Sequence, residues 1–222
     1  MTEPSDAERR TALFQAARAE IAARVPRAGT ASGAGTADDE PARALVALHE
    51  QPNREVFDTA AGMLGDDDPI TRELGVLVLR ELGPPGELDR RPFYAEAVPR
   101  LLDLLGRETD PRVLGFTISA LDYNGAREAL DAILPFARHP HRRVRFHVAS
   151  ALPGLIDPAA VDPRVVPALE QLCRDEDADT RFYALYALLE EIPGVDRERV
   201  AAPLADDPDE QIRDFARTLE IR

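Results

Sequence analysis

A helical signature returns five times along the chain, and this recurrence constrains the fold more than any other feature. The copies start at Thr71, Val113, Val144, Thr180 and Ile212, which puts successive starts 42, 31, 36 and 32 residues apart. The positions four, seven and eight residues after each start are small or apolar in almost every copy, as on one face of a helix. A period of this length is typical of stacked helix pairs. The sequence therefore predicts a one-dimensional stack with an extended surface for a partner.

A first helix precedes the signature in each repeat. The position eight residues before each start is apolar in every copy, namely Met63, Leu105, Phe136, Leu172 and Leu204. The apolar runs are rich in alanine and leucine and have helical spacing, which gives no indication of strands. We therefore expect an all-α fold, a right-handed α-solenoid (α-α superhelix) of about five helix pairs with an N-terminal helical cap. The predicted repeats are 53–83, 93–124, 126–155, 162–192 and 196–222.

The first 40 residues differ from the rest. Residues 1–25 are predicted to form an N-terminal helix, with Leu13, Ala17, Ile21 and Val25 on one stripe. Residues 26–40 are rich in Gly, Ala, Ser and Thr, a composition typical of a flexible linker. The repeat domain then covers 41–222. The N-terminal helix either hangs from the linker or docks as a cap on one end of the stack.

The loops inside the repeats carry acidic residues before proline. Asp68 can accept hydrogen bonds from the first N–H groups of a helix that begins at Pro69. The same pair returns as Asp110-Pro111 and Asp207-Pro208, whereas the equivalent loops hold His139-Pro140 in the third unit and Asp177 with Asp179 in the fourth. These runs lack the alternating ligands and the distant glutamate of a calcium loop. We therefore interpret them as helix caps.

A second helix that begins with Asp-Pro, continues with Val-Arg and places leucine at plus eight resembles the HEAT repeat. Its nearest form is the short bacterial one called PBS-lyase HEAT-like, and the best matches are residues 139–152 and 175–189. The resemblance covers the chain from residue 53 onward, and this family includes scaffolds, transport adaptors and a few enzymes. It implies that the arginines of the signature pair with loop aspartates of neighbouring repeats and are structural. Those arginines are Arg72, Arg145, Arg181 and Arg213.

The charge of the chain limits its partners. With 41 acidic and 27 basic residues, the net charge is −14, which disfavours binding to nucleic acid or to an anionic membrane. A nucleic-acid interface would need Arg112, Arg138, Arg142 and Arg143 to form one continuous basic stripe. There is no signal-peptide pattern and no apolar run long enough to span a bilayer. We expect a cytoplasmic protein, with the oligomeric state open and a monomer preferred.

Few residues suggest chemistry. Cys173 is the only cysteine, which excludes an internal disulfide and a thiolate metal site, and we expect a buried, inert thiol. The segment 138–147 holds three histidines and four arginines and is the one basic island of the chain. A metal site would need a third ligand that the sequence does not identify, so contact with a phosphate or an acidic partner is the better functional interpretation. We predict no catalytic residue, no metal and no cofactor.

The scarce aromatic residues are concentrated in the second helices of repeats two to four. They occupy positions that lean away from the repeated stripe, where they either fill the core or form an exposed aromatic groove with an acidic rim. Such a groove would suit a peptide or helix with basic and apolar anchors. The predicted partner-binding residues are Phe116, Ser119, Tyr123, Arg142, Arg143, Phe146, His147, Ser150, Phe182, Tyr186 and Glu190.

The predicted function is that of a non-enzymatic interaction module or adaptor. It would bind a segment of another protein on its concave face, because the resemblance implies that the second helices line that face. The alternative is an enzyme or enzyme accessory similar to the PBS lyases, acting on a cofactor or on a modified protein. A bound metal or chromophore would distinguish the alternative from the adaptor.

Overall fold

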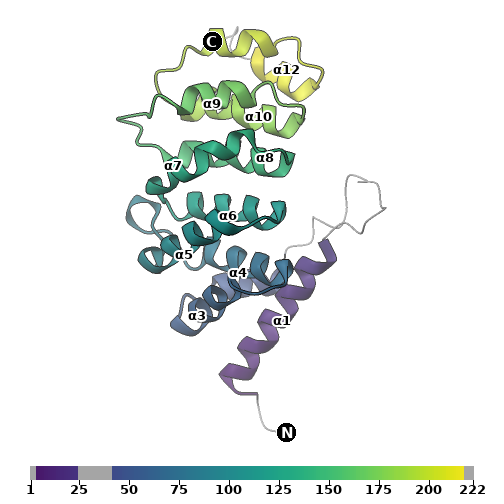
Figure 1. Ribbon diagram of the computed structural model, residues 1–222, viewed down its shortest axis with the longest axis vertical. Helices are drawn as coiled ribbons and strands as arrows, with labels where there is room; N and C mark the ends of the chain where they lie inside the picture. Colours follow the sequence, from purple (N-terminus) through teal and green to yellow (C-terminus); the bar gives the residue numbers. More distant parts are fainter. Residues whose placement is uncertain (1–3, 25–41, 218–222) are drawn as a thin grey trace.

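The computed structural model describes residues 4–24 and 42–217, and within these ranges it contains twelve α-helices and no strand (Figure 1). The prediction of an all-α solenoid is confirmed. The predicted linker 26–40 lies outside the described residues. Within the repeats, the helices alternate between two layers that run the length of the stack.

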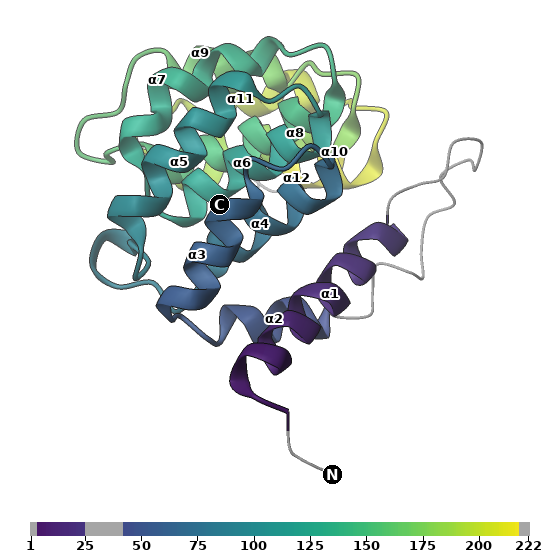
Figure 2. The ribbon, with the colours of Figure 1, turned by 60° about the horizontal axis from the view of Figure 1, so that its bottom comes forward.

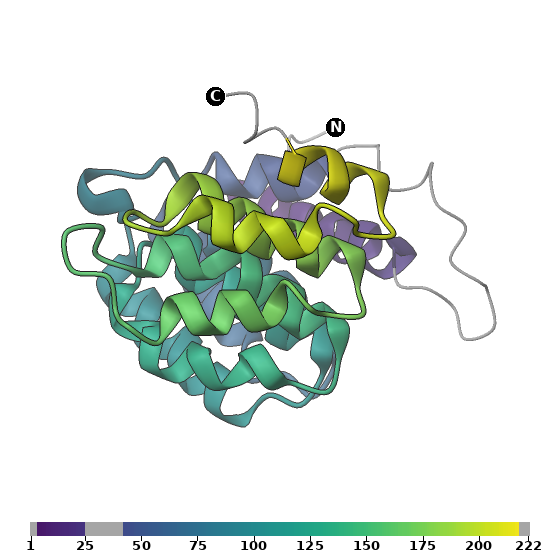
Figure 3. The same cartoon turned by 90° about the horizontal axis from the view of Figure 1, so that it is seen from above.

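The first helices of the repeats form one layer and the second helices the other (Figures 1 and 3). Each second helix packs against the second helix of the next repeat. The first helices are α3 (Arg54–Met63), α5 (Tyr94–Arg107), α7 (Leu130–Ile133), α9 (Val165–Leu172) and α11 (Arg197–Ala201). The second helices are α4 (Pro69–Glu81), α6 (Pro111–Tyr123), α8 (Arg142–Ala151), α10 (Ala178–Tyr186) and α12 (Glu210–Arg217).

Several helices change their winding before they end. Three of them continue as a 3₁₀ turn with a proline in its first positions, at Pro135, Pro153 and Pro203. Proline cannot donate the backbone hydrogen bond of a regular helix, so the change follows from the sequence. The 3₁₀ segments are η1 (Glu87–Asp89), η2 (Arg127–Ala129), η3 (Leu134–Arg138), η4 (Leu152–Leu155) and η6 (Ala202–Leu204), and η5 (Ala187–Glu191) is a π-helical extension of α10.

The N-terminal helix docks on the end of the stack. Helix α1 (Asp6–Arg24) packs against α2 (Arg43–His49) and α4, as Figure 2 shows. Ala17 and Ile21 of the predicted stripe are buried, together with Phe14, whereas Leu13 is half-buried; Val25, the last predicted member of the stripe, lies outside the described residues. Arg18 forms an ion pair of 2.7 Å with Asp68. The sequence left open whether this helix hangs from the linker or docks as a cap, and in the structure it docks as a cap.

Aspartate side chains cap most of the second helices. Asp68, Asp110 and Asp177 each accept a hydrogen bond from a backbone N–H of the first turn, as predicted. The expectation for the fifth repeat is wrong, because Asp209 and not Asp207 accepts from the first N–H groups of α12. Asp207 is instead held by an arginine of the preceding repeat.

At three of the four junctions between repeats, an arginine of the signature joins one repeat to the next, and we call this arrangement the arginine clamp. The guanidinium donates to two carbonyl oxygens of its own loop and to the carboxylate that begins the loop of the next repeat. Arg181, for example, contacts the carbonyls of Asp175 and Glu176 at 3.0 and 3.2 Å and the carboxylate of Asp207 at 2.8 and 2.9 Å. The other clamps are Arg72 with Glu108 and Arg145 with Asp175.

The clamp is missing between the second and third repeats. Leu114 occupies the position of the arginine, and His139 occupies the position of the carboxylate. Arg112, one residue before the second copy starts, instead pairs backward with buried Glu73 at 2.7 Å. Both partners of the clamp are thus absent together, which leaves no buried charge without a counterion at this junction.

We predict that replacing Arg181 with alanine lowers the free energy of unfolding by about 3 kcal/mol, because the change leaves buried Asp207 without its counterion. The matched control is Arg197→Ala, which breaks the ion pair with Glu190 between side chains that are 43% and 39% exposed. That change should cost less than about 1 kcal/mol. Urea unfolding followed by circular dichroism measures both. Equal losses would show that the clamp contributes no more than a surface ion pair.

Candidate partner-binding site

Aromatic rings form a continuous row across four second helices, and we call this row the aromatic ladder. It joins neighbouring helices at three places, and the ring centroids of each contact lie 5.1–5.6 Å apart. In order along the stack, its members are Phe116, His147, Phe146, Tyr183, Phe182 and Phe215. The ladder therefore passes from α6 through α8 and α10 to α12.

The members of the aromatic set differ in their exposure to solvent. Tyr123, Tyr183 and Tyr186 are 41%, 41% and 40% exposed, whereas the phenylalanines of the ladder are half-buried. A tyrosine can keep its hydroxyl in water while its ring packs against neighbours, whereas a phenylalanine has no polar group to hold at the surface. Both interpretations of the aromatic residues thus apply, since the phenylalanines contribute to packing and the tyrosines to the surface. We call this surface the second-helix face and define it by Ser119, Ser150, Tyr183 and Tyr186.

Sequence analysis missed one member of the ladder. Phe215 lies three residues after the start of the fifth copy, at the same position as Phe116, His147 and Tyr183 in earlier copies. Its ring contacts Phe182 at 5.6 Å, and Tyr186 at 5.9 Å. The register of the repeat places Phe215 in line with these residues, although the set predicted from the sequence ends with the fourth repeat.

His147 lies beneath the second-helix face instead of on it. Its side chain is only 9% exposed, and its ring packs directly on Gly115 of α6, where a Cβ atom would clash with it. Burial, together with the positive charges of Arg143 and Arg80, lowers the pKa of His147 to about 3. The imidazole is therefore neutral at physiological pH.

The beginning of α8 borders a hollow of about 460 Å³, which we call the α8 hollow. Phe116 and Phe146 supply apolar walls. Arg142 bonds to Asp177 at 3.2 Å across the opening. The full lining is Phe116, His141, Arg142, Arg143, Phe146, His147, Asp177 and Asp179, and it includes five of the predicted partner-binding residues.

The remaining predicted residues lie outside this hollow. Ser119 is half-buried and Ser150 is exposed. The guanidinium of Arg80 stacks on the ring of Tyr123, 4.1 Å from its centroid. Glu190 lies in η5 and pairs with Arg197 at 2.6 Å. The structure thus brings Phe116, Arg142, Arg143, Phe146 and His147 together and distributes the others along the same row of helices.

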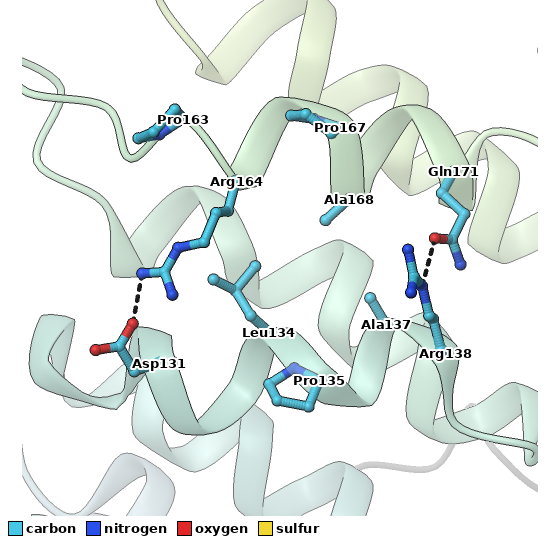
Figure 4. Close-up of a pocket in the computed structure, with 10 residues that line it drawn as sticks. All are labelled: Asp131, Leu134, Pro135, Ala137, Arg138, Pro163, Arg164, Pro167, Ala168 and Gln171. Atoms are coloured by element: carbon cyan, nitrogen blue, oxygen red, sulfur yellow. Dashed lines mark hydrogen bonds and ion pairs between the residues drawn. The ribbon is translucent and has the colours of Figure 1, made fainter.

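The basic island is divided between two sides of the molecule. Arg138 lines a separate pocket between η3 and α9, on the first-helix layer, where it donates to Gln171 at 2.9 Å (Figure 4). Arg112 is bonded to Glu73, and Arg145 belongs to a clamp. Arg112, Arg138, Arg142 and Arg143 therefore do not form the continuous stripe that a nucleic-acid interface would need.

The remaining candidates for chemistry are few. Cys173 is buried, and burial raises the pKa of its thiol to about 12, so the thiol is protonated at physiological pH. In the described part of the chain, no three His, Cys, Asp or Glu side chains are grouped to hold a metal ion. Each helix in the same ranges is too short or too polar to cross a membrane.

Comparison with known proteins agrees with this geometry. The family model of HEAT repeats matches residues 98–189. YibA from Escherichia coli has a similar structure, with a TM-score of 0.61 and 14% identity over 97% of this chain and 75% of its own. A designed armadillo repeat protein is also similar, with a TM-score of 0.57 and 14% identity over 97% of this chain and 93% of its own. These similarities show the fold.

A weaker similarity concerns the lyase alternative. The complex of CpcE and CpcF of phycocyanin lyase from Nostoc gives a TM-score of 0.47 and 22% identity over 98% of this chain and 91% of its own. An overlap at this level supports no inference about activity. No curated protein matches the chain in sequence.

We predict that Gly115→Ala destabilises the protein, because the new Cβ atom would displace the ring of His147. The matched control is Gly62→Ala in α3, where a Cβ atom meets nothing within 4 Å. Since alanine is the better helix former, Gly62→Ala should raise the free energy of unfolding. The Gly115→Ala variant should be less stable than the Gly62→Ala variant by about 2 kcal/mol. Thermal unfolding measures both. If the clash is with the ring of His147, the His147→Ala change must lower the stability less in the Gly115→Ala variant than in the unsubstituted protein.

We also predict that the Cys173 thiol of the folded protein resists alkylation, because it is both buried and protonated. At pH 8, iodoacetamide should modify it at least a hundredfold more slowly in native buffer than in 6 M guanidinium chloride. Mass spectrometry over a time course measures the two rates. Similar rates would show that the thiol is accessible and reactive in the fold.

Proposed function

We propose that this chain, a HEAT-repeat protein, acts as a non-enzymatic interaction module that holds a segment of another protein on its second-helix face. Repeat solenoids present extended surfaces, and recognition on such surfaces depends on side chains that the repeat itself does not require. In this chain those side chains are the aromatic and charged residues of α6, α8 and α10. The site would span repeats two to four.

The observation that carries the proposal is the position of the exposed tyrosines. In the described ranges, the exposed large hydrophobic side chains are Val46, Leu88, Tyr123, Tyr183 and Tyr186. Three of these five are tyrosines of the second helices, and two are next to one another on α10. Tyrosine is enriched among the residues that dominate binding energy at interfaces, because it buries a large ring and keeps a hydrogen-bonding group.

The charges beside the tyrosines indicate the polarity of the partner. Asp179 and Glu190 are exposed at the two ends of the second helix of the fourth repeat, on either side of Tyr183 and Tyr186. A segment with apolar side chains for the tyrosines and basic side chains for these acids would be complementary to this part of the face. An amphipathic helix or an extended peptide can present such a pattern.

We predict that a photocrosslinking phenylalanine analogue at Ser150 captures a partner protein in cells of the source organism. The matched control carries the analogue at Gln171, which is exposed on the first-helix layer. The captured protein should be absent from the control. Its yield should fall at least tenfold when Tyr183 and Tyr186 are both changed to alanine, since truncated interface anchors commonly cost that much affinity.

Two results would contradict the proposal. One is capture of the same protein at Gln171 with equal yield. The other is an unchanged yield in the double tyrosine variant, whose folding is checked by its circular dichroism spectrum and melting temperature. Both tyrosines are exposed, so we expect little change in stability from their truncation.

A further inference from the structure

The arginine clamps of the last three repeats form a chain of alternating charges. Arg145 holds the carboxylate of Asp175, and the backbone carbonyl of Asp175 accepts a hydrogen bond from Arg181. Arg181 in turn holds the carboxylate of Asp207, and the carbonyl of Asp207 accepts a hydrogen bond from Arg213. Positive and negative side chains therefore alternate along the stack, and Arg213 is the last of them.

The three complete clamps use the nitrogens of the guanidinium in the same way. In Arg72, Arg145 and Arg181, the Nη1 atom donates to two carbonyl oxygens of the loop before its own helix. The Nε and Nη2 atoms donate side by side to the carboxylate of the next loop. Two parallel bonds of this kind match the spacing of the two carboxylate oxygens. The repeat thus builds the same bidentate carboxylate site three times.

Arg213 has the same arrangement but donates to no carboxylate among the described residues. Its Nη1 atom donates to the carbonyls of Asp207 and Pro208 at 2.8 and 3.1 Å. Its Nε and Nη2 atoms donate to no residue that the structure describes, and neither atom is closed off from solvent. We call these two nitrogens the open fork. The bonds of Nη1 hold the plane of the guanidinium, so the open fork is preorganised for a carboxylate.

The open fork belongs to the uncovered end of the stack. Helices α6, α8 and α10 each lie between two other second helices, whereas α12 has α10 on one side and no described helix on the other (Figures 1 and 3). Each complete clamp joins its arginine to the repeat that follows. By the same geometry, the open fork is directed toward the side of α12 that no described helix covers.

The three occupied forks define the ligand that fits. Their carboxylates belong to Glu108, Asp175 and Asp207, and each of these also accepts the backbone N–H of the residue two positions later, at 2.9–3.0 Å. That later residue is an aspartate in every case, and it caps the following helix. We call this element the acid-x-Asp turn. A helix that begins with such a turn presents its first carboxylate in the form that a clamp arginine binds.

The acid-x-Asp turn of the first repeat does not fit the open fork of a second copy. Asp66 accepts the backbone N–H of Asp68 at 2.9 Å, as in the other turns. However, helices α1 and α2 pack against α4, and Arg18 binds Asp68 at 2.7 Å. A second copy would have to lose this cap before its α4 could pack on α12. The occupant is therefore a different protein.

We infer that the uncovered end of the stack at α12 is a second interaction surface, which binds an acid-x-Asp turn at the start of a helix in a different protein. The open fork of Arg213 donates to both oxygens of the first acid and so completes a fourth clamp. The inference goes beyond the proposed function, because this surface is separate from the second-helix face.

The direct test uses a peptide that copies residues 108–111, the turn held by Arg72. The full chain is labelled with ¹⁵N-arginine, and the Nε–H signal of Arg213 is identified by its loss in the Arg213→Lys variant. Acetyl-Glu-Thr-Asp-Pro-amide should shift this signal saturably and bind at least fivefold more tightly than acetyl-Gln-Thr-Asp-Pro-amide, because only the glutamate offers two charged acceptors. The signals of Arg72, Arg145 and Arg181 should not move, since their forks are occupied. Equal binding of the two peptides, or no saturable shift, would overturn the inference.

Two lysine variants in the same helix provide the matched control. Arg213→Lys keeps the charge but loses the two parallel donors, so it should weaken the glutamate peptide at least fivefold, as measured on the backbone amide signals of α12. Arg217→Lys changes an exposed arginine that pairs with Asp206 at 3.1 Å, and it should keep the affinity within twofold. Equal losses would show attraction by charge alone and would refute the fork. The comparison of the two peptides needs no variant, so it stands even if Arg213→Lys folds poorly.

Light scattering of the full chain tests the choice of occupant. We expect a monomer at all concentrations. A larger species that Arg213→Lys and Asp66→Asn each return to the monomer would show that a second copy completes the clamp, which contradicts the assignment to a different protein. The proposed function is tested independently, because the crosslinker at Ser150 lies on the second-helix face and its yield should not change in the Arg213→Lys variant.

Discussion

The arginine clamp is the interaction on which the regular stacking of the repeats depends. It is a buried ion pair whose charges are compensated by hydrogen bonds to carbonyl oxygens of one repeat and to the loop of the next. The acceptor carboxylate also organises its own loop, since Asp175 and Asp207 each accept a backbone N–H two residues later. A buried pair of this kind tolerates little displacement. It therefore restrains the orientation of the second helices at the three junctions that have it.

The one junction without a clamp is also where the unusual chemistry of the chain lies. Because Leu114 and His139 replace the two clamp partners, the loop before α8 lacks the acid that its equivalents have, and the helix begins with arginines. The junction is instead packed by His147 against Gly115. Natural sequences break their own local rules mainly at functional sites, at some cost in stability. The coincidence of these departures at one junction supports a binding role for it.

The packing of the aromatic ladder explains how one face can serve both stability and recognition. Phenylalanine rings fill the space between adjacent second helices, and the tyrosines next to them extend to the solvent. The half-buried phenylalanine rings hold the exposed tyrosine rings in place, so little conformational freedom would be lost when a partner binds. A face of this kind is preorganised by the same contacts that hold the repeats together.

The sequence by itself determined the repeat, the all-helical stack and the helix positions of the aromatic residues. These follow from periodicity, because residue spacing gives the direction of a side chain around its own helix. The structural role of the clamp arginines was implied by the resemblance to HEAT repeats. Only the tertiary structure decided that His147 is covered, that Arg138 lies apart from Arg142, that Asp209 caps α12 and that Phe215 completes the ladder. These facts depend on which neighbouring helix or loop covers a side chain, and spacing within one helix contains no information about its neighbours.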